Sequence, residues 1–135
     1  MPYLEWTDDL SVNVKEIDTQ HKKLVKMVNT LHEAFIANKA NNVHKEIIDG
    51  MVEYARVHFA TEEKYMLKFN FPGYEQHKEE HNTFVQKAVE LQNQFKKAGF
   101  VFSNDILDFL RKWLKNHILG TDKKYSNFFN ENDLF

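Results

Sequence analysis

Four long stretches of the chain carry apolar residues at intervals of three and four positions. This spacing places the apolar side chains along one face of an α-helix. The chain has only four Gly and two Pro, which favours a few long helices over many short strands. The sharpest break is Phe71-Pro72-Gly73, because proline cannot continue a helix. The predicted helices span residues 19–37, 43–69, 74–97 and 103–120.

Short connections between these helices place consecutive helices side by side and antiparallel. The expected fold class is therefore all-α: an antiparallel up-down-up-down four-helix bundle with a short C-terminal helical tail. A chain of 135 residues is long enough to close one hydrophobic core. We expect residues 1–135 to form a single domain.

The first part of the chain, residues 1–18, has a different pattern. The β-branched alternation at 11–14 disfavours a helix, so we predict an N-terminal extended arm. Apolar residues spaced along this arm predict that it packs on the bundle. Asp18 is the expected N-cap of the first helix.

Composition excludes several classes of protein. The chain has 18 basic and 20 acidic residues and a net charge of −2, which argues against a nucleic-acid-binding surface. It has no Cys, which excludes disulfides, iron–sulfur clusters and cysteine-type zinc sites. No apolar run approaches the roughly 20 residues of a membrane span, and the N-terminus has no signal-peptide pattern. We therefore expect a soluble, cytoplasmic protein.

Candidate functional residues lie on both sides of the Phe-Pro-Gly break. His58 and Glu62 precede the break, and His77 and His81 follow it. The members of each pair are four residues apart, so on a helix their side chains share one face, one turn apart.

The predicted topology brings further histidines to the same level. In an antiparallel bundle the start of the first helix and the end of the fourth lie beside this break, which adds His21 and His117. Five of the seven histidines therefore converge on one layer, together with Glu62. His32 and His44 do not join it, and His32 lies roughly 16 Å along the axis from His21.

Taken singly, each of these residues has an ordinary explanation. A lone histidine on an apolar helical stripe is more often a hydrogen-bonded core residue than a ligand, and a lone His/Glu pair is usually a solvated surface. Burying five imidazoles and a carboxylate together without a cation would cost several kcal/mol for each group. Nitrogen and oxygen ligands without sulfur suit Fe, Mn, Zn or Cu. Six candidate ligands exceed the needs of one tetrahedral zinc, so two metal ions are favoured over one.

The sequence resembles the hemerythrins, especially their bacterial members. The resemblance rests on His21, His58-x3-Glu62, His77-x3-His81 and His117-x4-Asp122, which are similar to the seven ligand positions of that family. The flanking segments are similar too: WTDDLSV (6–12), IDTQH (17–21), HFATEE (58–63), WLKNHI (113–118) and DKKY (122–125). One departure is Asn13, where the family usually has Gly, and Asn tolerates a positive φ better than most residues.

Asp122 follows from the resemblance alone. It is five residues beyond His117, about 140° around an ideal helix and therefore off the shared face. If Asp122 binds metal, the last helix must bulge or break near Gly120.

The resemblance also implies the cofactor. His77, His81 and His117 would serve one iron and His21 and His58 the other, with both irons bridged by Glu62, Asp122 and an oxo or hydroxo group. If each iron is roughly six-coordinate, this arrangement leaves one position open on the two-histidine iron. Flanking residues resemble the apolar oxygen pocket of the family, although each is also explained as ordinary core: Leu24, Phe59, Trp113, Leu114 and Ile118. Tyr125 would add a hydrogen bond to the ligands, or would simply pack.

A single open position suits a small end-on ligand better than a reaction that also needs substrate on the metal. The favoured function is reversible dioxygen binding at a non-haem di-iron centre, for oxygen transport, storage or delivery to an oxygen-using protein partner. The alternative is a sensor of oxygen, redox state or nitric oxide at the same site. A third class is catalytic reduction of peroxide or nitric oxide, but we expect that the protein is not an enzyme. Nitric oxide and small anions are further candidate ligands of the open iron. A ferritin-like oxidase is disfavoured because its Glu-x-x-His motifs are absent.

Overall fold

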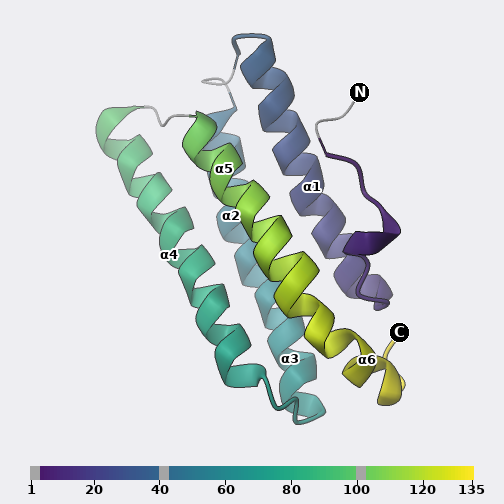
Figure 1. Cartoon of the computed structure of the whole chain (residues 1–135). Helices are drawn as coiled ribbons and strands as arrows, with labels where there is room; N and C mark the ends of the chain where they lie inside the picture. The colour runs from purple at the N-terminus through teal and green to yellow at the C-terminus, as the bar shows by residue number, and fades with distance from the viewer. Residues whose placement is uncertain (1–3, 40–42, 100–102) are drawn as a thin grey trace.

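The computed structural model of the chain describes residues 4–39, 43–99 and 103–135. Helices account for the regular secondary structure of these residues, and no strand occurs among them. Four helical columns run side by side (Figure 1), and α1 packs against α2 and α5, while α4 packs against α2 and α3. The predicted all-α four-helix bundle is confirmed. The columns are α1 (Lys15–Ile36); α2 (His44–Tyr54) continuing through a π-helical segment (Ala55–Phe59) into α3 (Ala60–Lys68); α4 (Tyr74–Ala98); and α5 (Ser103–Trp113) continuing through a second π-helical segment (Leu114–Asp122) into α6 (Lys123–Glu131).

The break between α3 and α4 follows the expected turn chemistry. Asn70 has a φ of 58°, in the left-handed region that ends a helix. A Cβ on Gly73 would lie 2.7 Å from the ring of Phe71, so only glycine allows this ring to fold back over the turn. The turn therefore reverses the chain within a few residues and places the start of α4 beside the end of α3.

The N-terminal arm ends earlier in the chain than predicted. Helix α1 begins at Lys15, so the arm ends at Val14 rather than at residue 18. Asp18 lies inside the first turn and is not the N-cap; its backbone N–H donates to Val14 O at 2.9 Å. Its carboxylate instead accepts hydrogen bonds from Val12 N at 2.8 Å and Ser11 Oγ at 2.6 Å. Asp18 therefore ties the arm back onto the helix. The arm also contains one short 3₁₀-helix, Asp8–Leu10, where extended chain was expected.

The arm packs on the bundle, as its apolar residues predicted. Ser126 Oγ of α6 donates to Val12 O at 2.6 Å. At the other end of the arm, Leu4 N donates to Asn29 Oδ1 at 2.7 Å, and Asn29 Nδ2 donates to Leu4 O at 2.8 Å. Asn13 adopts a φ of 58°, so the turn expected at this departure from the family pattern does form.

Two apolar clusters fill the interior, and a polar layer lies between them. The larger cluster includes Leu24, Phe59 and Ile118, and the smaller one includes Ile17, Met66 and Tyr125. Along the chain His21 lies between Ile17 and Leu24, Glu62 between Phe59 and Met66, and Asp122 between Ile118 and Tyr125. Each of these columns therefore crosses from one cluster to the other at a residue of the polar layer. No helix among the described residues is long and apolar enough to cross a membrane.

Candidate metal centre

The polar layer contains all seven residues singled out in the sequence. Each is almost completely buried, with at most 2% of its surface exposed. The set comprises His21 from α1, His58 from the first π-helical segment, Glu62 from α3, His77 and His81 from α4, and His117 and Asp122 from the second π-helical segment. The other two histidines, His32 and His44, lie outside this layer, as predicted.

The second π-helical segment explains how Asp122 reaches the layer. In a π-helix each N–H bonds to the carbonyl five residues earlier, so residues five apart lie close to the same face. His117 Nε2 is accordingly 3.0 Å from Asp122 Oδ1. The irregularity expected near Gly120 is confirmed, but it extends over nine residues, Leu114–Asp122, rather than being a local break.

The first π-helical segment, Ala55–Phe59, was not predicted. It contains His58, whose Nε2 lies 2.6 Å from Glu62 Oε1. The four-residue spacing of this pair is equally compatible with a regular α-helix. The sequence therefore carried no signal that could have revealed the segment.

Ligand atoms of the seven residues form two groups. One consists of Glu62, His77, His81, His117 and Asp122, and the other of His21, His58, Glu62 and Asp122; in each group the atoms lie within 4.8 Å of one another. Both groups thus contain the same two carboxylates. One group has three imidazoles and the other has two.

The facing atoms are close together, but apart from the hydrogen bond between His77 Nε2 and Asp122 Oδ1 most are poorly placed to bond to each other. Asp122 carboxylate oxygens lie 2.6 Å from His77 Nε2 and 3.1 Å from His21 Nε2, and Glu62 Oε1 lies 3.5 Å from His81 Nε2. Among the described residues, these buried atoms have no hydrogen-bond partner: Nε2 of His21, His58, His81 and His117, both carboxylate oxygens of Glu62, and Oδ2 of Asp122. Buried polar atoms without partners are costly, and nitrogen and oxygen atoms converging on shared points fit metal ions. The donor set therefore fits two metal ions held between the same carboxylates.

Three of the imidazoles are held from outside through their second nitrogen. His58 Nδ1 lies 2.6 Å from Gln20 Oε1, His81 Nδ1 lies 2.9 Å from Glu63 Oε2, and His117 Nδ1 lies 3.1 Å from Glu80 Oε1. A proton on Nδ1 donated to these acceptors leaves the lone pair of Nε2 directed inward. None of these three partners was predicted from the sequence, because a glutamate or glutamine near a histidine has no pattern that distinguishes it from a solvated surface residue.

The layer is anionic apart from any protons on its histidines. Burial acts to raise the pKa of Glu62, but the neighbouring histidines, His58 first, hold it well below its usual range. Burial and Glu62 act to raise the pKa of Asp122, but His117 and His21 outweigh them and lower it. Burial lowers the pKa of His77, yet its hydrogen bond to Asp122 and the nearby carboxylate of Glu62 raise it to about 10. Without metal, protonated imidazoles therefore balance the carboxylates, and a bound cation would displace those protons.

Aromatic and aliphatic side chains enclose the layer on the side of the larger cluster. Phe59 stacks on His81 at a ring-centroid distance of 3.9 Å, and Trp113 stacks on His117 at 4.0 Å. Leu24, Leu114 and Ile118 are buried in the same apolar cluster. The five predicted pocket residues are therefore in one dry region, which excludes water from this side of the layer.

Tyr125 lies on the opposite side of the layer, in the smaller cluster, with its ring 5.3 Å from that of His77. Its hydroxyl has no well-formed hydrogen bond among the described residues. Burial, and then the carboxylates of Asp122 and Glu62, raise the pKa of this phenol well above its usual value. Tyr125 is therefore a neutral, buried side chain close to the ligand carboxylates.

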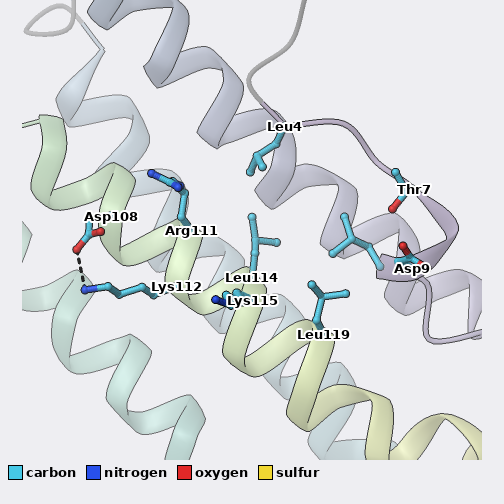
Figure 2. A pocket seen from close by; sticks show the side chains of 10 residues that line it. Leu4, Thr7, Asp9, Asp108, Arg111, Lys112, Leu114, Lys115 and Leu119 are labelled. Carbon is cyan, nitrogen blue, oxygen red and sulfur yellow. Dashed lines mark ion pairs between the residues drawn. The ribbon is translucent and has the colours of Figure 1, made fainter.

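A surface groove of about 480 Å³ separates the arm from α5 and the second π-helical segment (Figure 2). Its apolar side includes Leu4, Leu10 and Leu119, and its rim carries the ion pair between Asp108 and Lys112 at 2.9 Å. Leu114 lines this groove and also belongs to the predicted pocket. This side chain therefore lies between the outer groove and the dry region beside the layer.

Comparison with known proteins agrees with this geometry. Residues 12–128 match the model of the hemerythrin family, described as the hemerythrin HHE cation binding domain. The chain is 36% identical over 127 residues to a bacteriohemerythrin of Stenotrophomonas maltophilia (strain R551-3), covering 94% of this chain and 82% of that protein. It is 33% identical over 126 residues to a bacteriohemerythrin of Methylococcus capsulatus, covering 93% and 95%.

A solved structure of a wild-type hemerythrin superposes with a TM-score of 0.82 at 32% sequence identity, covering 93% of this chain and 96% of that one. The structural resemblance therefore holds over almost the whole length of both chains. The chain belongs to the hemerythrin family.

Proposed function

We propose that the protein binds dioxygen reversibly at a non-haem di-iron centre in the polar layer. Hemerythrins generally bind oxygen through a di-iron site. The observation that carries the proposal is the division of the buried donors into two groups that share both carboxylates, one with three imidazoles and one with two.

In this proposal His77, His81 and His117 hold one iron, and His21 and His58 hold the other. Glu62 and Asp122, which belong to both donor groups, would be shared by the two irons. The protein then supplies one ligand fewer to the second iron, which leaves room there for one small guest molecule. Two ferrous ions would supply the electrons that dioxygen needs in order to bind.

The protein side chains give this site its selectivity. Gln20, Glu63 and Glu80 fix the imidazole orientations from outside, so the ligand atoms are held in position before metal binds. The apolar walls, including Phe59 and Trp113, keep water from the guest position, and this protects a bound oxygen molecule from irreversible loss. Tyr125 remains neutral on the far side of the layer and is available to donate a hydrogen bond to a bridging carboxylate.

The proposal is tested by metal analysis combined with optical spectroscopy. We expect two irons per chain and a visible absorption band that disappears on deoxygenation and returns on exposure to air over repeated cycles. His58→Gln should abolish the band, whereas His32→Gln, outside the layer, should leave it unchanged. Immediate and permanent oxidation in air, or one metal ion per chain, would contradict the proposal. Turnover with added peroxide or nitric oxide would favour a catalytic role instead.

A further inference from the structure

Three aromatic rings cover three of the five clustered histidines. Tyr54 stacks on His58 with a centroid distance of 4.8 Å and an interplanar angle of 19°. Phe59 and Trp113 stack in the same way on His81 and His117, at 3.9 Å and 4.0 Å. Tyr54 and Phe59 come from one helical column and Trp113 from another, and together the three rings form a roof over the layer on the side of the larger apolar cluster.

Tyr54 and Trp113 lie close to each other in this roof because they share two neighbours. Tyr54 is 5.9 Å from Phe59 and 5.7 Å from Phe84, measured between ring centroids. Trp113 is 5.8 Å from Phe59 and 4.9 Å from Phe84. Both rings therefore border the dry region that the proposed function assigns to the guest molecule.

Each of these two rings carries a buried polar group without a well-formed hydrogen bond. Tyr54 is 7% exposed and Trp113 is 8% exposed. The Tyr54 hydroxyl and the Trp113 indole nitrogen form no well-placed hydrogen bond among the described residues. The indole N–H can only donate, so its contact with the Tyr54 oxygen leaves the hydroxyl proton free to donate elsewhere. An unsatisfied buried hydroxyl destabilises a fold, so its presence in an otherwise apolar roof requires an explanation. A phenol of ordinary pKa, about 10, keeps its proton at neutral pH, so the hydroxyl can donate.

We propose that the Tyr54 hydroxyl donates a hydrogen bond to the guest molecule in the pocket, a diatomic or triatomic ligand with an electron-rich outer atom, such as dioxygen or azide. This inference rests on the proposed function. Tyr54 is favoured over Trp113 because it stacks on His58, a member of the two-histidine group, where the protein supplies one ligand fewer. Trp113 stacks on His117, a member of the three-histidine group.

A hydrogen-bond donor in an apolar pocket has a consequence for specificity. A guest whose outer atom accepts a hydrogen bond is stabilised, whereas an apolar guest of the same size leaves the hydroxyl unsatisfied. Tyr54 is thus a specificity-determining residue that does not itself bind the metal.

The test compares Tyr54→Phe, which removes only the hydroxyl oxygen, with the matched control Tyr65→Phe. The Tyr65 hydroxyl donates to Glu16 at 3.0 Å and is remote from the roof. Three quantities are measured for each variant and for the unmodified protein: the azide dissociation constant of the oxidised iron-loaded form, the dioxygen dissociation rate of the reduced form, and the urea unfolding of the metal-free form.

We expect Tyr54→Phe to weaken azide binding about three- to tenfold, the effect of one lost hydrogen bond, and to hasten dioxygen release by a similar factor. Tyr65→Phe should change neither quantity. Metal-free Tyr54→Phe should be at least as stable as the unmodified protein, because the variant removes a buried hydroxyl that has no well-formed hydrogen bond in the absence of a guest.

Equal azide affinity and equal dioxygen release in the two variants would overturn the inference. A destabilised metal-free Tyr54→Phe protein with unchanged azide affinity would also overturn it, because the hydroxyl would then be a structural partner of Trp113. If the unmodified protein oxidises irreversibly in air but its azide affinity still depends on Tyr54, the proposed function fails and this inference stands. If it binds neither ligand, both fail.

Discussion

Removing the metal should give the protein a stability that falls as the pH rises from neutral. In the metal-free layer His77 Nε2 lies 2.6 Å from Asp122 Oδ1 and 3.5 Å from Glu62 Oε2. Burial lowers the pKa of His77, but these two carboxylates outweigh it and raise the pKa from 6.5 to about 10. The pKa of His81 is also raised, against burial, by Glu62 and Glu63.

The sign follows from counting protons. Between pH 6.5 and about 10 the folded chain keeps the proton on His77, whereas the unfolded chain has lost it. The folded state then binds more protons, so the free energy of unfolding falls with pH by roughly 1.4 kcal/mol per unit for each such proton. The contribution of His77 is fully present below pH 6.5 and is lost by about pH 10. It amounts to about 5 kcal/mol, which is large compared with the usual stability of a domain.

Iron should abolish this dependence, because the loaded layer and the unfolded chain both carry neutral histidines above the usual histidine pKa. A metal ion needs the neutral imidazole, so loading the folded protein releases the protons held on His77 and His81 and becomes more favourable as the pH rises. The assay is urea unfolding followed by circular dichroism at a series of pH values from 6.5 to 9.5, with chelator for the metal-free form and with two equivalents of ferrous iron, without oxygen, for the loaded form. Proton release on loading is measured in parallel in weak buffer.

Two variants separate the cluster from the rest of the chain. His77→Gln should remove about one proton from the slope of the metal-free protein, whereas His32→Gln should leave the slope unchanged. A free energy of unfolding that is constant or rises between pH 7 and 9.5 in the metal-free protein would refute the reasoning. It would mean that the two carboxylates do not hold protons on the neighbouring imidazoles.

Three further predictions concern the walls, the outer partners and the arm. Leu114→Ala or Ile118→Ala should open the dry region and hasten oxidation of the reduced, iron-loaded protein several-fold in stopped-flow absorbance, and an unchanged rate would reject the pocket. Gln20→Ala removes the acceptor 2.6 Å from His58 Nδ1 and should weaken iron binding about 10- to 100-fold in competition with a chelator; Gln20→Glu, which keeps the acceptor, should bind iron more tightly than Gln20→Ala. Ser126→Ala removes the hydrogen bond to Val12 O at 2.6 Å and should lower the free energy of unfolding by about 1 kcal/mol, and a loss within the error of urea titration would show that this contact does not hold the arm.

The level of the histidines along the bundle was predictable because it depends on few quantities. A helix advances about 1.5 Å per residue, and short connections make consecutive helices antiparallel. Counting from the turn at 71–73 then places His58 and His77 within roughly two to three turns of the same end of the bundle, and the same arithmetic adds His21 and His117. Side-chain contacts do not affect this height, so hydrophobic periodicity and loop length were sufficient to predict it.

Positions that depend on local hydrogen-bond choices were not predictable in this way. The start of α1 moved from residue 19 to Lys15 because the Asp18 carboxylate accepts from Val12 and Ser11 in the arm rather than capping the helix. The partners Gln20 and Glu80 have a role only because a histidine nitrogen from another column faces them. Such contacts are tertiary, and no residue pattern along the chain encodes them.

The two π-helical segments connect the fold to the proposed function most directly. In each segment the backbone N–H bonds to the carbonyl five residues earlier, one residue further than in an α-helix. This shift leaves little signal in the amino-acid composition, and the resulting helix is less favourable than a regular α-helix. Both occur next to the shared carboxylates: Ala55–Phe59 ends three residues before Glu62, and Leu114–Asp122 ends at Asp122 itself. Without the second segment, Asp122 would lie about 140° from His117 and outside the layer. The irregular helix geometry is therefore what brings a second carboxylate to both donor groups, and this sharing is the feature that distinguishes a two-metal centre from a buried cluster of histidines.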